Sequence, residues 1–232
     1  MITNISRQLT TGVLAIAGSV AALSFAGAAQ AASIVQTATL PNTTTNFTNT
    51  PLSGLTQFDS SLGTLNSVIV TLDATVAGTV GLENTGPSAS SITYNLQASV
   101  AVSSPSVGSL LTSVPAFSGT FNAGPFDGIL DFGGTSGTTI SNLTANASQT
   151  TTLTTGLTPF IGPGALSAFL SGTGQSNASG SGNVVSGFTT QAGGTVTVQY
   201  NYTPASTSVP EPSAILGILA VAGIGAFARR KS

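Results

Sequence analysis

The chain has 232 residues, of which only 4% are charged, and it contains neither cysteine nor histidine. The lack of cysteine excludes disulfide bonds, thiolate zinc sites and cysteine nucleophiles. All four basic residues lie near the two ends of the chain, and they are Arg7, Arg229, Arg230 and Lys231. Residues 32–208 contain five acidic residues and no basic one, a formal charge of about −5, which excludes nucleic-acid binding because that binding depends on Lys and Arg.

Residues 1–31 are predicted to be a secretory signal peptide. Arg7 lies in the short first region, and an apolar run follows from Val13 to Ala26. The small residues at the expected cleavage site are Ala29 and Ala31, with the cut before Ala32. We therefore expect signal peptidase to process the chain and the protein to be exported, rather than this stretch forming a structural helix.

Residues 32–203 are predicted to form one all-β cargo domain, an antiparallel β-sandwich of the jelly-roll or immunoglobulin-like type. Two stretches, 68–77 and 91–102, alternate apolar and polar residues with the period of a strand that has one buried face. Their inward sets are Val68, Val70, Leu72, Ala74 and Val76, and Ile92, Tyr94, Leu96, Ala98, Val100 and Val102. No helical period occurs within this region, so a sandwich is favoured and a barrel is the alternative.

The remaining elements are less sharply marked. Further strands are expected at 34–40, 109–114, 116–122, 129–132, 138–143, 148–153 and 195–202, and a short strand or helical turn at 165–170. Irregular segments are expected at Pro41-Asn42 with the threonines that follow, at 85–88, at 159–164, and in a flexible Gly/Ser/Asn-rich loop at 171–183. Aromatic residues at core positions are predicted to be Phe117, Phe121, Phe126, Tyr94, Tyr200 and Tyr202.

The cargo is expected to be non-catalytic and to bind no cofactor. Its many Ser and Thr hydroxyls have no His, Lys or Cys partner that could form a nucleophile–base pair. The remaining option is a glycosidase that uses two carboxylates, although the chain has no Trp for sugar stacking. The available acids are Asp59, Asp73, Glu83, Asp127 and Asp131. We expect them to be turn residues, acceptors of backbone N–H groups and solvated edge charges.

Asp127 and Asp131 are the candidate metal ligands. They are four residues apart among several glycines, and hard oxygen ligands without His or Cys favour calcium. The spacing fits no EF-hand loop, and two solvated turn acids are the alternative interpretation.

The C-terminal region contains three successive signals after a short linker at 204–208. They are Val209-Pro210-Glu211-Pro212, an uncharged apolar run at 214–228, and Arg229-Arg230-Lys231. The run is short for a bilayer span, at about 22 Å as a helix. Because basic residues follow it, we nevertheless expect a transmembrane helix at 214–228 rather than a buried core helix.

This tail at 209–232 resembles the PEP-CTERM sorting signal of exported proteins from Gram-negative bacteria. The resemblance implies recognition by an exosortase, a membrane-embedded protease or transpeptidase, in organisms that make extracellular polysaccharide. The two prolines fix φ, so the motif should be extended and accessible to an enzyme.

The cargo also resembles the choice-of-anchor E domain, which occurs with various surface-anchoring tails and brings no catalytic residues. The matching pieces, in order, are Phe58-Asp59, residues 62–68, Glu83-Asn84, residues 131–137 and residues 196–204.

Together these features predict a non-catalytic exported protein of the cell surface or extracellular matrix, which passes through the inner membrane during sorting. An adhesive or carbohydrate-binding module that contacts extracellular polysaccharide through polar sheet faces is the alternative.

Overall fold

Residues 31–205 are described by a computed structural model of the chain. The predicted transmembrane helix at 214–228, the sorting motif, the basic triplet and Ala29 of the cleavage site lie outside the described residues. Within residues 31–205, no helix is long and apolar enough to cross a membrane.

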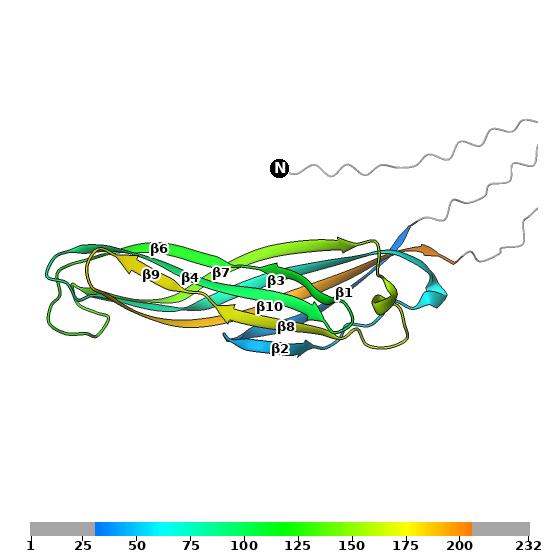
Figure 1. Cartoon of the computed structure of the whole chain (residues 1–232), viewed down its shortest axis with the longest axis horizontal. Coiled ribbons are helices and arrows are strands. Elements are labelled where there is room, and N and C mark those ends of the chain that lie inside the picture. The colour runs from blue at the N-terminus through cyan, green and yellow to red at the C-terminus, as the bar shows by residue number, and fades with distance from the viewer. Residues whose placement is uncertain (1–30, 206–232) are drawn as a thin grey trace, which may run out of the picture. The chain divides into compact units, whose positions relative to one another are not determined.

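The described residues form ten strands and two short 3₁₀ helices (Figure 1). The strands are β1 (Ala32–Thr44), β2 (Phe47–Leu52), β3 (Gly63–Asn84), β4 (Ser90–Ser104), β5 (Gly108–Ser113), β6 (Ala116–Ala123), β7 (Gly137–Leu153), β8 (Ala168–Gly174), β9 (Asn177–Gly180) and β10 (Val184–Pro204). The 3₁₀ helices are η1 (Ser60–Leu62) and η2 (Thr158–Phe160).

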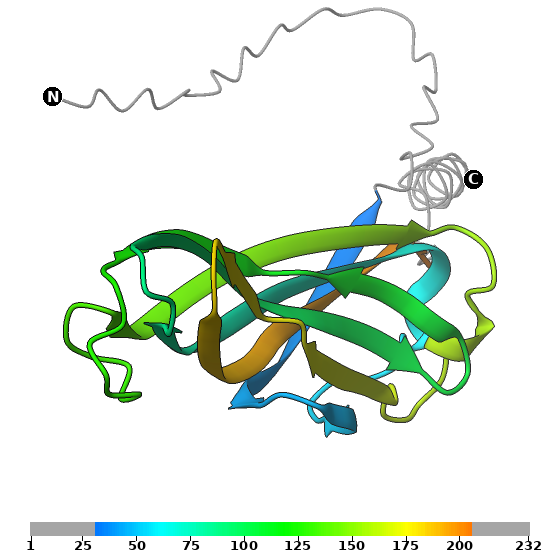
Figure 2. The same ribbon diagram turned by 60° about the vertical axis from the view of Figure 1, so that its left-hand side comes forward.

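The strands make two antiparallel sheets, which pack as a β-sandwich (Figure 2). The first sheet has the order β1-β10-β3-β7 and is called sheet A. The second, sheet B, has the order β2-β8-β4-β5, with β6 and β9 also paired to β4. The all-β antiparallel prediction is therefore confirmed.

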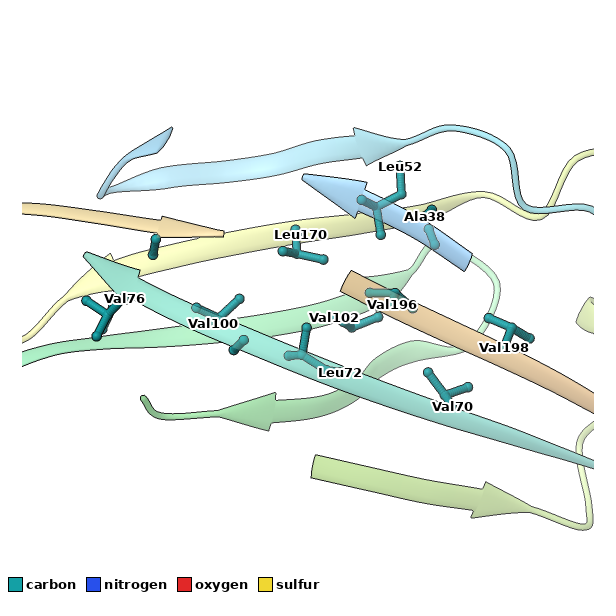
Figure 3. Packing of buried hydrophobic residues seen from close by; sticks show 14 of the residues in the cluster. Ala38, Leu52, Val70, Leu72, Val76, Val100, Val102, Leu170, Val196 and Val198 are labelled. Carbon is teal, nitrogen blue, oxygen red and sulfur yellow. The ribbon is translucent and has the colours of Figure 1, made fainter. Parts of the chain in front are cut away.

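The core lies between the two sheets and is built from the alternating residues of β3, β4 and β10. The predicted inward residues of β3 and β4 are all buried, and Leu72 and Val100 are completely inaccessible. Figure 3 shows their side chains directed toward one another from the two sheets, with Val196 from β10 and Leu170 from β8. A one-residue slip of β3 would move this apolar set to the outer face, so the pattern fixes the register.

Several predicted strand boundaries are wrong. Pro41-Asn42 is not a connection but a bulge within β1, where the pairing with β10 shifts between Leu40 and Thr43. Gly193 on β10 accommodates this bulge, since a Cβ there would lie only 2.6 Å from the Leu40 carbonyl oxygen. The threonine-rich stretch after it contains β2, which pairs with β8.

The segment 129–132 is not a strand but part of the loop that joins β6 to β7. The two strands predicted at 138–143 and 148–153 are one strand, β7, with a register shift against β3 between Gly78 and Val80. The region 171–183, predicted to be a flexible loop, contains the end of β8 and all of β9, because both can pair with β4.

Candidate functional site

A polar groove of about 670 Å³ crosses all four strands of sheet A. Paired residues of neighbouring strands share a face, so the register places Thr44, Gln191, Ala77 and Thr144 in one row. This row is on the outer face, because Ala77 is next to the core residue Val76. The thirteen lining residues include no charged side chain: Thr44, Thr45, Asn46, Ala77, Gly78, Thr79, Asn142, Leu143, Thr144, Phe188, Thr189, Thr190 and Gln191.

Irregular backbone shapes both ends of this groove. Asn142 on β7 has a φ of 58° at the register shift, and Asn46 has a φ of 71° where the chain leaves sheet A for sheet B. The crossing is held by hydrogen bonds from the Thr45 N–H to the Thr190 carbonyl (3.0 Å) and from the Asn46 N–H to the Gly172 carbonyl (2.7 Å). Asparagine tolerates positive φ better than most residues, which suits it to both positions.

The groove can offer hydrogen bonds to a neutral polar ligand. Its threonine hydroxyls and its Asn and Gln amides both donate and accept. Phe188 is the one aromatic residue that lines it, and that residue is partly buried against the core. A second polar hollow of about 440 Å³, lined in part by Thr93, Asn95 and Asn177, lies on sheet B.

The loop between β6 and β7, residues 124–136, lies at one end of the sandwich (Figures 1 and 2, green). The Phe132 ring covers the paired glycines Gly81 and Gly187, and a Cβ on Gly81 would lie 3.0 Å from the ring. A hydrogen bond from the Thr139 hydroxyl to the Phe132 carbonyl (3.2 Å) connects the loop backbone at Phe132 to β7. This loop, called the cover loop below, buries the end of β3.

Asn84 fastens the base of the cover loop to β3. Its side-chain amide donates to the carbonyls of Gly124 (2.7 Å) and Ser88 (2.8 Å), and its backbone N–H donates to the Ser136 carbonyl (2.9 Å). Asn84 is completely buried, so these bonds satisfy polar groups that water cannot reach.

Glu83 lies beneath the cover loop and is completely buried, which corrects the prediction that all five acids are solvated or bonded to backbone N–H groups. Among the described residues, no hydrogen-bond donor reaches either of its carboxylate oxygens. Its neighbour across the sheet is Gly137, where a Cβ would overlap Glu83 Oε2.

The two predicted metal ligands are both in the cover loop. Asp127 Oδ1 accepts from the Ile129 N–H (3.1 Å), and Asp131 Oδ1 accepts from the Gly133 N–H (2.9 Å). Each carboxylate thus closes a local turn. Within residues 31–205, no three His, Cys, Asp or Glu side chains are grouped closely enough to hold a metal ion as they stand.

The remaining two acids lie apart from the cover loop. Asp59 is exposed and caps η1, and the Ser61 N–H that it accepts (2.8 Å) lowers the pKa of its carboxyl. Asp73 is exposed on the outer face of β3, opposite Ser148 and Thr195.

The end of the cargo that leads toward the sorting tail is anchored by aromatic packing. Phe58 contacts Tyr200 and Tyr202 at ring-centroid distances of 5.9 and 5.1 Å. The Tyr200 hydroxyl donates to the Thr56 carbonyl (2.8 Å), and burial raises the pKa of this phenol to about 12. The Ala205 N–H donates to the Leu62 carbonyl (2.9 Å), so the chain is held up to the last described residue.

Phe126 is the one predicted core aromatic residue that is exposed, with 36% of its surface accessible. It belongs to the cover loop with Ile129 and Leu130, which are also exposed. The groove and the burial of Glu83 were not predicted, because both depend on which strands become neighbours. The abundance of Thr and Asn in residues 43–46 and 142–144 was the only local signal.

Comparisons with known proteins bear mainly on the tail. No curated protein matches the chain. Two solved structures, described as infectious bursal disease virus strains Gx and Gt, share 10% and 9% identity with TM-scores of 0.12 and 0.11. They cover 84% and 83% of this chain, which spans about half of their length (48% and 47%). These TM-scores are too low to indicate a common fold. Residues 208–231, however, match the PEP-CTERM protein-sorting motif, so this chain carries an exosortase sorting signal and is exported to the cell envelope.

Proposed function

We propose that the cargo is a non-catalytic protein of the cell surface or extracellular matrix, delivered there through its sorting tail. Signal peptidase removes residues 1–31, and the apolar run at 214–228 holds the chain in the inner membrane until exosortase acts. The observation that carries the proposal is the sorting motif at residues 208–231. The groove of sheet A agrees with a non-catalytic role, because its lining has hydroxyl and amide groups and no carboxylate. Hydrolysis of a glycosidic bond by the usual route needs two carboxylates on either side of the bond.

Similarity to the choice-of-anchor E domain forms part of this proposal. In space, its scattered pieces gather into two groups. Glu83-Asn84 contacts residues 131–137 at the cover loop, through the Asn84–Ser136 hydrogen bond and the Glu83–Gly137 pair. Phe58 and residues 62–68 contact residues 196–204 at the other group, through the aromatic cluster and the pairing of Gly63 with Pro204. Because the pieces within each group contact one another, we propose that they share a structural role in the folded domain.

A second candidate function is carbohydrate binding in the sheet A groove. The groove is uncharged, as suits a neutral polysaccharide, and its Thr, Asn and Gln side chains match sugar hydroxyls as hydrogen-bond partners. Ligand pockets commonly have volumes of about 300–1,000 Å³, a range that includes this groove. With Phe188 partly buried, binding would depend on hydrogen bonds more than on ring stacking.

Retention on the producer's own polysaccharide separates these two functions. We would compare the wild-type exported protein with Gln191→Ala, and use Gln199→Ala as the control. Both glutamines are on the outer face of β10, but only Gln191 lines the groove. Saturable retention that Gln191→Ala weakens and Gln199→Ala leaves unchanged would establish the binding module. Absence of retention in the wild type would favour the structural role. Equal retention of all three proteins would show that the groove is not the binding site.

A further inference from the structure

The burial of Glu83, an ionisable side chain, is unfavourable in free energy. This side chain is completely buried, and neither Oε1 nor Oε2 has a hydrogen-bond partner among the described residues. Taking a carboxylate out of water without a partner costs several kcal/mol, so such groups normally pair with a cation or a donor. The four basic residues of the chain all lie outside residues 31–205, so the described residues contain no cationic partner for Glu83.

Two other carboxylates face the same piece of backbone, Gly133-Gly134. Asp131 Oδ1 accepts from the Gly133 N–H at 2.9 Å, while Asp127 Oδ2 occupies the place where a Cβ on Gly134 would lie. Glu83 Oε2 similarly fills the Cβ position of Gly137, and that position is 2.7 Å from the Gly133 nitrogen. Glu83, Asp127 and Asp131 therefore all approach the segment 133–137, and the described residues contain no positive charge.

The glycines make this arrangement possible. A side chain at Gly137 would displace the Glu83 carboxylate, and one at Gly134, which has a φ of 65°, would displace Asp127. Because glycines replace side chains here, backbone carbonyls can also approach a small ion from the cover loop. A purely structural turn would not need a buried glutamate without a hydrogen-bond partner.

We infer that Glu83 is the buried ligand of a calcium site beneath the cover loop, and that Asp127 and Asp131 move inward to complete it. All available ligands are oxygen atoms, which suits calcium and disfavours zinc or copper. The acids are not yet at coordinating positions in the described structure. Ion binding therefore draws the cover loop toward β3 and makes it more rigid.

The test is a calcium titration of the exported protein after EDTA treatment, followed by calorimetry and thermal melting. The wild type should bind with a dissociation constant of about 10⁻⁴–10⁻³ M, the range of extracellular calcium modules, and its melting temperature should rise with calcium. Glu83→Gln, which keeps the side-chain shape, should lose this response. Asp73→Asn, which alters an exposed acid on the same strand, should keep it.

Two results would overturn the inference. One is a wild-type melting temperature that millimolar calcium leaves unchanged. The other is a calcium response that Asp127→Asn with Asp131→Asn removes but Glu83→Gln retains, since that would place the ion on the loop surface. Amide hydrogen exchange of the wild type needs no variant and covers the case in which Glu83→Gln fails to fold. Calcium should slow exchange across residues 124–137, and unchanged exchange there would also refute the site.

Discussion

Leu72→Ala should strongly destabilise the cargo, because Leu72 is at the centre of the sandwich. It is completely buried on β3 and is paired with Val196 on β10 and with Gln149 on β7. One of its methyl carbons would lie 3.1 Å from a Cβ on Gly194, so little open space surrounds it. Buried Leu→Ala changes cost about 2–5 kcal/mol, and strands held on both sides relax little, so we expect about 3–5 kcal/mol here.

For a domain of this size, each kcal/mol lowers the melting temperature by about 2–4 °C, so the expected loss is about 6–20 °C. The assay is thermal melting by circular dichroism, with urea titration to check that the m-value is unchanged. Thr71→Ala is the matched control, because Thr71 is half-buried on the outer face and the change removes its 2.9 Å hydroxyl contact with Thr150. That variant should lose less than about 1 kcal/mol. Equal losses in the two variants would refute the register of β3.

Two further predictions concern the described ends of the cargo. Tyr200→Phe removes the hydroxyl that donates to the Thr56 carbonyl and should cost about 0.5–1.5 kcal/mol, because Thr56 is exposed and water can replace the lost donor. Burial raises the pKa of Tyr200 from 10.0 to about 12, so the folded state holds this proton more tightly. The resulting stability is present below pH 10 and is lost between pH 10 and 12. Thermal melts at alkaline pH should show this loss in the wild type and a smaller loss in Tyr200→Phe. Identical pH profiles of the two proteins would contradict this prediction. N-terminal sequencing of envelope material should begin at Ala32, the first residue of β1, and an intact Met1 terminus would show that no signal peptide is removed.

The strand predictions were most accurate where the two faces of a strand have different environments. β3 and β4 alternate clearly because one face of each packs in the core, and every predicted inward residue there is buried. The first half of β10 lacks such alternation and contains Gly187, Gly193 and Gly194, so it was missed. It is nevertheless a strand, because β3 supplies a pairing partner along its whole length.

The candidate sites could not be predicted from local patterns, because they depend on contacts between residues that are far apart in the sequence. Residues 129–132 are apolar enough to suggest a strand, but they belong to a loop in which Phe132 packs on Gly81 and Ile129 is exposed. Glu83 is buried only because that loop, more than 40 residues later in the chain, folds back over it. The sorting tail could be predicted because its motif, apolar run and basic triplet are contiguous.

Exosortase processing of this exported protein at its tail is tested most directly by the mass of the C-terminal peptide from surface material. We predict that the wild-type surface protein lacks the basic end Arg229-Arg230-Lys231, and that Glu211→Ala accumulates in the membrane with this end intact while its cargo stays folded. Glu211 lies outside all the described strands, so its replacement should leave their melting temperature unchanged. Surface protein that retains the full C-terminus, or normal release of Glu211→Ala, would contradict the account.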